Sequence, residues 1–120
     1  FCSTPMVALS RNVANKYAME MLLTGDMISA QRASEIGLIN RVANSSDLKQ
    51  TTEEIAAKIA SKSSMTLAVG KKAFYAQREM SLSEAYGYAS DVMVQNMLAR
   101  DAEEGIGAFI EKRQPVWQDK

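Results

Sequence analysis

The sequence predicts a mostly α-helical protein, with about seven helices and one short strand. Three observations support this class. The two prolines, Pro5 and Pro115, lie near the ends of the 120-residue chain. The stretch between them is rich in Ala, Met, Leu, Glu and Lys, which favour helices. Apolar residues recur there at helical spacing, and Ser or Gly residues stand where these periodic segments begin and end.

Three short helices are predicted before residue 40. Their periodic segments cover residues 6–13, 16–23 and 30–36. Gly25 follows the second segment and Gly37 the third, and glycine is the usual residue just beyond a helix C-terminus. Ser29 is placed to cap the third helix at its N-terminus.

Residues 38–42 are the one segment whose composition indicates a β-strand. A lone strand leaves backbone N–H and C=O groups unpaired along both edges. We therefore expect this strand to pair with a partner outside the 120 residues. The chain is accordingly predicted to be incomplete or to assemble with another chain.

Four further helices are predicted, starting near residues 47, 63, 81 and 101. Ser81 and Glu84 match the capping box, in which a hydroxyl and a carboxylate three residues later bond each other's backbone N–H. Asp101 and Glu104 show the same start signal for the last helix, which Pro115 prevents from continuing. The helix from residue 81 carries an apolar stripe that is expected to be buried: Leu82, Tyr86, Ala89, Met93 and Met97.

Composition argues against several functions. The 14 basic and 14 acidic residues cancel, so binding of nucleic acid through phosphate neutralisation is not expected. No apolar run approaches the roughly 18 residues of a membrane span. Histidine is absent, which removes Ser-His and Cys-His catalysis and the usual zinc ligands. No metal site is predicted.

Phe109 and Lys112 are the most informative candidate site. They lie three residues apart, on adjacent positions of one helix face. An aromatic ring beside an ammonium group suits a ligand that combines a flat base with a phosphate. In the alternative, Phe109 packs in the core and Lys112 caps the helix end. The residues alone leave both interpretations open.

Two segments resemble a known family. Residues 19–42 read MEMLLTGDMISAQRASEIGLINRV, and residues 103–115 read EEGIGAFIEKRQP. They are similar to two hallmarks of the enoyl-CoA hydratase/isomerase, or crotonase, superfamily. The first is Leu-Thr-Gly, Ile-Ser-Ala and Gly-Leu-Val/Ile in succession. The second is Glu-Gly-x-x-Ala-Phe-x-Glu-Lys-Arg-x-Pro near the end, and the resemblance covers essentially the whole chain.

The resemblance implies that residues 1–120 are the C-terminal part of an enoyl-CoA hydratase/isomerase domain. That part is the helical portion of an α/β spiral fold, and in relatives it covers the active site and builds a homotrimer or hexamer. The whole protein would bind or process fatty acyl-CoA thioesters in mitochondria, with no permanently bound cofactor. The family's catalytic glutamates and oxyanion-hole N–H groups precede this region. No catalytic residue is therefore transferred, and the chain alone is expected to be inactive.

The resemblance also assigns a role to the candidate pair. Phe109 and Lys112 match the residues that contact the adenine and phosphate end of CoA bound to the adjacent subunit. The predicted strand at residues 38–42 would join the sheet of the spiral. An alternative of another class is a non-enzymatic helical module, such as a truncated isoform that associates with intact subunits.

Overall fold

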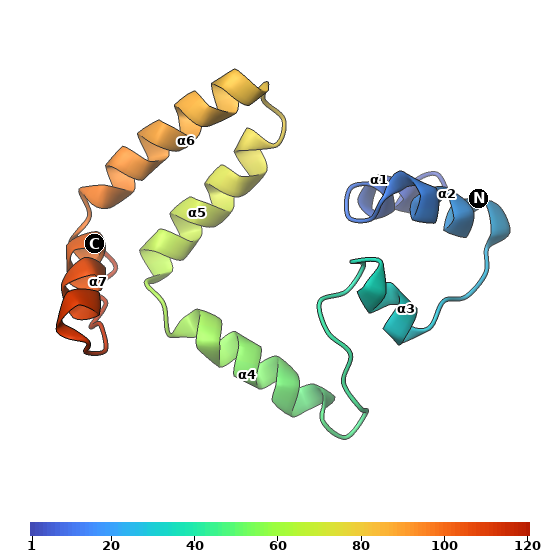
Figure 1. The fold of residues 1–120 in the computed structure, drawn as a ribbon, viewed down its shortest axis with the longest axis horizontal. Helices are drawn as coiled ribbons and strands as arrows, with labels where there is room; N and C mark the ends of the chain where they lie inside the picture. Colours follow the sequence, from blue (N-terminus) through green and yellow to red (C-terminus); the bar gives the residue numbers. More distant parts are fainter. The chain divides into compact units, whose positions relative to one another are not determined.

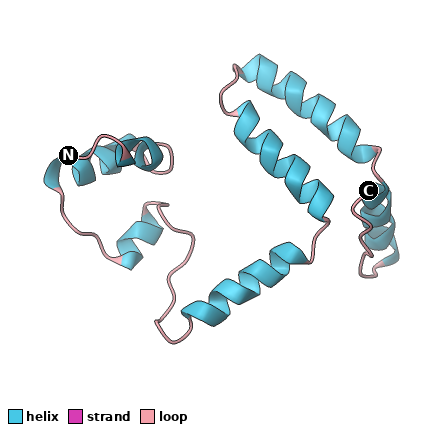
Figure 2. Ribbon diagram, turned by 180° about the vertical axis from the view of Figure 1, so that it is seen from behind, coloured by secondary structure: helices cyan, strands magenta, loops and turns pink.

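The structure, a computed structural model, describes residues 1–120 and contains seven α-helices and no β-strand (Figures 1 and 2). The mostly α-helical class predicted from the sequence is confirmed. The chain divides into two compact units, Phe1–Thr51 and Thr52–Lys120. None of the helices has the length and apolar character needed to cross a membrane. The helices are α1 (Pro5–Ser10), α2 (Asn15–Thr24), α3 (Ala30–Glu35), α4 (Leu48–Ala60), α5 (Ser64–Gln77), α6 (Leu82–Met97) and α7 (Arg100–Glu111).

In the first unit, the predicted stop and start signals are confirmed. Gly25 ends α2 with a φ of 70°, and its N–H donates to the Met21 carbonyl at 3.0 Å. Gly37 follows α3 with a φ of 81°. Both values lie in the left-handed region that glycine adopts without strain. Ser29 caps α3, because its hydroxyl accepts the Arg32 N–H at 3.1 Å.

The strand predicted at residues 38–42 is wrong for this chain, since these residues form bends and irregular structure. The N–H groups of Leu38 and Ile39 both donate to the Ala33 carbonyl, at 2.8 and 3.3 Å. The segment therefore begins as the closing turn of α3. A β-strand needs a neighbouring strand to satisfy its backbone groups, and the chain supplies none.

In the second unit, α5 and α6 lie side by side, and α7 contacts α6 (Figures 1 and 2). Ser63 caps α5 by accepting the Thr66 N–H at 3.2 Å. The capping box at the start of α6 is confirmed. Ser81 donates its backbone N–H to the Glu84 carboxylate at 3.0 Å, and Glu84 donates its own N–H to the Ser81 hydroxyl at 3.4 Å.

Few apolar side chains are buried within the chain, whose accessible surface is 9700 Å². A compact folded monomer of this mass is expected to expose about 6,400 Å², and two separate folded proteins of half the mass would together expose about 7,700 Å². The accessible surface of this chain is larger than either value. The prediction that the α6 stripe is buried is wrong for the chain alone, because Leu82 is 76% and Tyr86 71% exposed. Helical periodicity identifies a face suited to burial. It does not show that the covering surface belongs to the same chain.

Candidate ligand site at the end of the last helix

The candidate pair lies at the C-terminal end of α7. Phe109 stands in the last turn, and Lys112 is the residue at which the helix ends. Phe109 is 84% exposed, so it does not pack in a core within this chain. Lys112 is also exposed. Lys112 therefore ends the helix through its backbone, and Phe109 is left uncovered within this chain.

The backbone of Lys112 is strained. Its φ of 56° and ψ of 36° place it in the left-handed region. The Arg113 N–H donates to the Ala108 carbonyl at 3.0 Å and the Lys112 N–H to the Phe109 carbonyl at 3.3 Å. This pair of bonds is the Schellman motif, in which glycine normally occupies the left-handed position. A residue with a side chain costs roughly 1–2 kcal/mol there, so a lysine at this position suggests a function for its side chain.

The next residue, Arg113, is held by a carboxylate from the first half of the same helix. Its Nη1 and Nη2 atoms donate to Oε1 and Oε2 of Glu104 at 2.6 and 2.9 Å, a two-pronged geometry that planar guanidinium favours. Its Nε donates to the Glu111 carboxylate at 2.5 Å. The Arg113 guanidinium, followed by the Val116 N–H, lowers the pKa of Glu104 to about 2. Glu104 is therefore ionised at neutral pH.

We call residues 113–120 the C-terminal strap. A second carboxylate, Asp101, binds its far end and is itself only 2% exposed. Its Oδ1 accepts the Gln118 N–H at 2.8 Å, and its Oδ2 accepts the Asp119 N–H at 3.0 Å. The Ser63 hydroxyl and then the Gln118 N–H lower the pKa of Asp101 below its ordinary value. The burial of this charge is thus compensated by hydrogen bonds.

The interpretation of Asp101 and Glu104 as the start signal of the last helix is wrong. The residue that precedes α7 as its cap is Ala99, and it makes no side-chain bond. Both carboxylates instead bind the C-terminal strap, 9 to 18 residues further along the chain. A capping rule covers only three residues, so no local pattern could reveal these partners.

Trp117 fastens the C-terminal strap to the rest of the second unit. Its indole N–H donates to the Ser61 carbonyl at 2.8 Å. Its ring lies against Gly105 of α7, where an added Cβ atom would stand 3.3 Å from the ring. The Asp119 carboxylate accepts the Ser64 N–H at 2.7 Å. The strap therefore joins the end of α7 to the start of α5.

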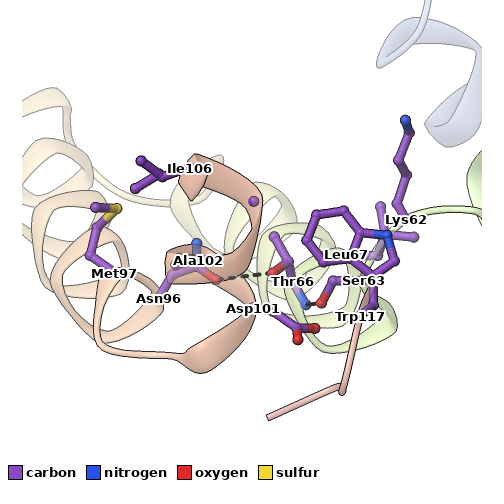
Figure 3. A pocket seen from close by; sticks show the side chains of 11 residues that line it. Lys62, Ser63, Thr66, Leu67, Asn96, Met97, Asp101, Ala102, Ile106 and Trp117 are labelled. Atoms are coloured by element: carbon purple, nitrogen blue, oxygen red, sulfur yellow. Dashed lines mark hydrogen bonds between the residues drawn. The ribbon is translucent and has the colours of Figure 1, made fainter. Parts of the chain in front are cut away.

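A mostly apolar cavity of about 440 Å³ opens beside the C-terminal strap (Figure 3). Its walls include Leu67, Met97, Ile106 and Trp117. On its polar side, the Thr66 hydroxyl donates to the Asn96 side-chain oxygen at 3.4 Å, the contact drawn as a dashed line in Figure 3. Phe109 and Lys112 are not among the lining residues. The cavity and the candidate pair are thus separate features of α7.

Acidic and thiol side chains elsewhere in the chain form no metal-binding cluster. No group of three or more His, Cys, Asp or Glu side chains could hold a metal ion. Cys2 is a free, exposed thiol. The carboxylates of Asp101 and Glu104 are bonded to the C-terminal strap.

Comparison with known proteins gives consistent matches. A family model described as enoyl-CoA hydratase/isomerase matches residues 2–120. The chain is 52% identical over 117 residues to rat (Rattus norvegicus) enoyl-CoA hydratase domain-containing protein 3, mitochondrial, covering 98% of this chain and 39% of that protein. The human (Homo sapiens) counterpart is 50% identical with the same coverage. These names confirm the mitochondrial location predicted from the sequence, and the chain spans only 39% of the length of these relatives.

Solved structures agree with this likeness. A crystal structure of an enoyl-CoA hydratase from Mycobacterium smegmatis matches with a TM-score of 0.94 and 47% identity. The crystal structure of human enoyl-CoA hydratase domain-containing protein 3 matches with a TM-score of 0.92 and 50% identity. Each alignment covers 98% of this chain and 46% of the other. The predicted helical portion of a larger fold is therefore confirmed.

Proposed function

Because the chain belongs to the enoyl-CoA hydratase/isomerase family, we propose that it supplies the helical part of a protein that binds or processes fatty acyl-CoA thioesters. Residues 1–120 act as the C-terminal part of such a domain, whose helices cover the active site and form the contacts of a homotrimer or hexamer. The ligand is a CoA thioester. No permanently bound cofactor is required.

The observation that carries the proposal is the strained, exposed lysine three residues after an exposed phenylalanine. The Phe109 ring offers a flat apolar face on which an adenine base can stack. The Lys112 ammonium offers a point charge for a phosphate. Keeping lysine at a position that favours glycine costs stability, and a ligand contact explains why the side chain is kept.

We assign no catalytic residue to this chain. Chemistry on a thioester requires N–H donors aimed at the oxygen on which negative charge develops. The family resemblance places those donors, and the hydratase glutamates, in the region that precedes the part matched here. Crotonyl-CoA supplied to the 120-residue chain alone should therefore retain its enoyl-thioester absorbance. Turnover by this chain alone would overturn the assignment.

The binding role can be tested by calorimetry with CoA on the natural polypeptide that carries these residues. Lys112→Glu reverses the charge and should weaken binding at least about 10-fold, and Phe109→Ala should weaken it about 5-fold or more through lost stacking. Lys16→Glu is the matched control, because it reverses an exposed lysine in the first turn of α2, where a glutamate is tolerated. Equal affinity of Lys112→Glu and Lys16→Glu would contradict the proposal.

A second candidate function is a non-enzymatic oligomerisation module. The exposed apolar residues of α6, among them Leu82 and Tyr86, favour it because such a face is normally covered. The module hypothesis predicts that the chain co-purifies with an intact family subunit and binds no CoA by itself. Tyr86→Glu should abolish that association. Association that survives this change would argue against the α6 face as the contact.

A further inference from the structure

The C-terminal end of α7 needs support beyond the helical backbone hydrogen bonds to keep its shape. A left-handed lysine is disfavoured, and helix ends readily fray. Strained residues persist only where the surrounding structure fixes them. The residue that fixes Lys112 is the one that follows it, Arg113.

Arg113 is fixed at two levels. Its backbone N–H donates to the Ala108 carbonyl at 3.0 Å, which closes the turn containing Lys112. Its guanidinium is gripped by both oxygens of Glu104 at 2.6 and 2.9 Å. Glu104 lies nine residues earlier on α7, so the pair ties the residue after the turn back onto the body of the helix. Rotation of the Lys112 backbone out of the left-handed region would pull these contacts apart.

Glu104 also holds the chain beyond the turn. Its Oε1 accepts the Val116 N–H at 2.7 Å. Asp101 anchors the next residues, and the indole of Trp117 anchors the middle of the strap on Ser61. Lys112 thus lies between α7 and the strap, and the Glu104 carboxylate of α7 holds the strap against the helix.

The charges at this end are unequally paired. Arg113 is paired with two carboxylates, those of Glu104 and Glu111. The Lys112 ammonium makes no ion pair within the chain. A carboxylate that grips the arginine and leaves the neighbouring lysine unpaired keeps one positive charge available for an anion.

We infer that Glu104 is a positioning residue for the CoA contact: by clamping Arg113 and the strap, it holds Lys112 in the left-handed conformation from which its ammonium reaches the ligand. This inference rests on the proposed function. It adds a residue that touches no ligand and acts through another. The role is distinct from general stabilisation, because it predicts that Glu104 matters for binding only while Lys112 is a lysine.

The test is a double-mutant cycle on CoA affinity, measured by calorimetry on the natural polypeptide that carries these residues. Glu104→Gln should weaken CoA binding about 5-fold, because an amide cannot make the charged two-pronged contact. In the Lys112→Gly background the same change should have no further effect. Glu103→Gln is the matched control, since it removes an exposed charge one residue away and should leave affinity within about twofold.

A second variant covers the case in which Glu104→Gln folds poorly. Arg113→Lys keeps the charge and loses the planar fork, so it should weaken CoA binding by a similar factor and should not add to Glu104→Gln. Trp117, the one tryptophan among these 120 residues, reports on the strap, because its emission shifts to longer wavelength when the ring enters water.

The outcomes separate the two claims. Wild type that fails to bind CoA contradicts the proposed function, and the inference falls with it. Wild type that binds, with Lys112→Gly weakened and both Glu104→Gln and Arg113→Lys unchanged, overturns the inference alone. An equal loss from Glu104→Gln with lysine or glycine at position 112 also overturns it, because Glu104 would then act by another route.

Discussion

The ends of α2 and α7 solve the same problem in different ways. Gly25 ends α2 with a φ of 70°, and Lys112 ends α7 with a φ of 56°. Glycine adopts this conformation freely, and at the end of α2 the Gly25 N–H donates to the Met21 carbonyl. Lysine does not adopt this conformation freely, and the end of α7 is held by the contact between Glu104 and Arg113. A helix end that carries a useful side chain therefore needs support that a glycine end does without.

The largest expected effect is at the unclamped end. Gly25→Val should lower the free energy of unfolding by roughly 1–2 kcal/mol or more, because a β-branched side chain is disfavoured in the left-handed region. Gly25→Asn should cost less, since asparagine visits that region. Urea unfolding followed by circular dichroism measures both. A valine variant as stable as wild type would show that the end of α2 can adopt another conformation.

Acid should release the clamped end and spare the glycine end. Glu104 has a pKa of about 2 in the folded chain against 4.5 ordinarily, and the pKa of Asp101 is also lowered. Groups with depressed pKa values contribute stability above their unfolded pKa, and that stability is lost as the pH falls through the folded value. Trp117 emission should therefore stay constant above about pH 5 and shift to longer wavelength between about pH 4.5 and 2.

The control for this titration is Glu104→Gln, which should already show part of the shift at neutral pH and should titrate less below pH 4.5. A transition of the wild-type emission between about pH 5 and 8 would contradict the account, because neither carboxylate titrates there.

Two glycines inside helices provide a smaller, matched comparison. A Cβ atom at Gly87 of α6 would meet nothing within 4 Å. Gly87→Ala should therefore raise the free energy of unfolding by about 0.5–1 kcal/mol, because alanine favours the helix over glycine. The same atom at Gly105 would stand 3.3 Å from the Trp117 ring. That ring is held by its N–H bond to the Ser61 carbonyl. Gly105→Ala should therefore give no such increase in the free energy of unfolding, and it should shift the Trp117 emission. Equal gains at both sites would show that the strap is not firmly packed.

Local signals in the sequence were enough to predict most helix boundaries. Ser29, Ser81 and Gly25 act on partners within four residues, and each does in the structure what its position predicts. The prediction of a strand at residues 38–42 was wrong because a strand forms only when its backbone groups pair with another strand, and the structure has none.

The candidate site was predicted only in part, for the same physical reason. Spacing placed Phe109 and Lys112 together at one helix end, but the left-handed backbone of Lys112 depends on contacts made by Arg113. Asp101 and Glu104 resembled a capping pattern, whereas their partners lie in the strap. Interactions that span 9 to 18 residues leave no spacing rule in the sequence.

The most direct test is Lys112→Gly, with stability and CoA affinity measured on the same sample. The account predicts opposite signs: the free energy of unfolding rises by about 1 kcal/mol, because glycine relieves the left-handed strain, while CoA binding weakens at least about 10-fold, because the ammonium is gone. A variant that is more stable and binds CoA as tightly as wild type would contradict the claim that this lysine is kept for its ligand.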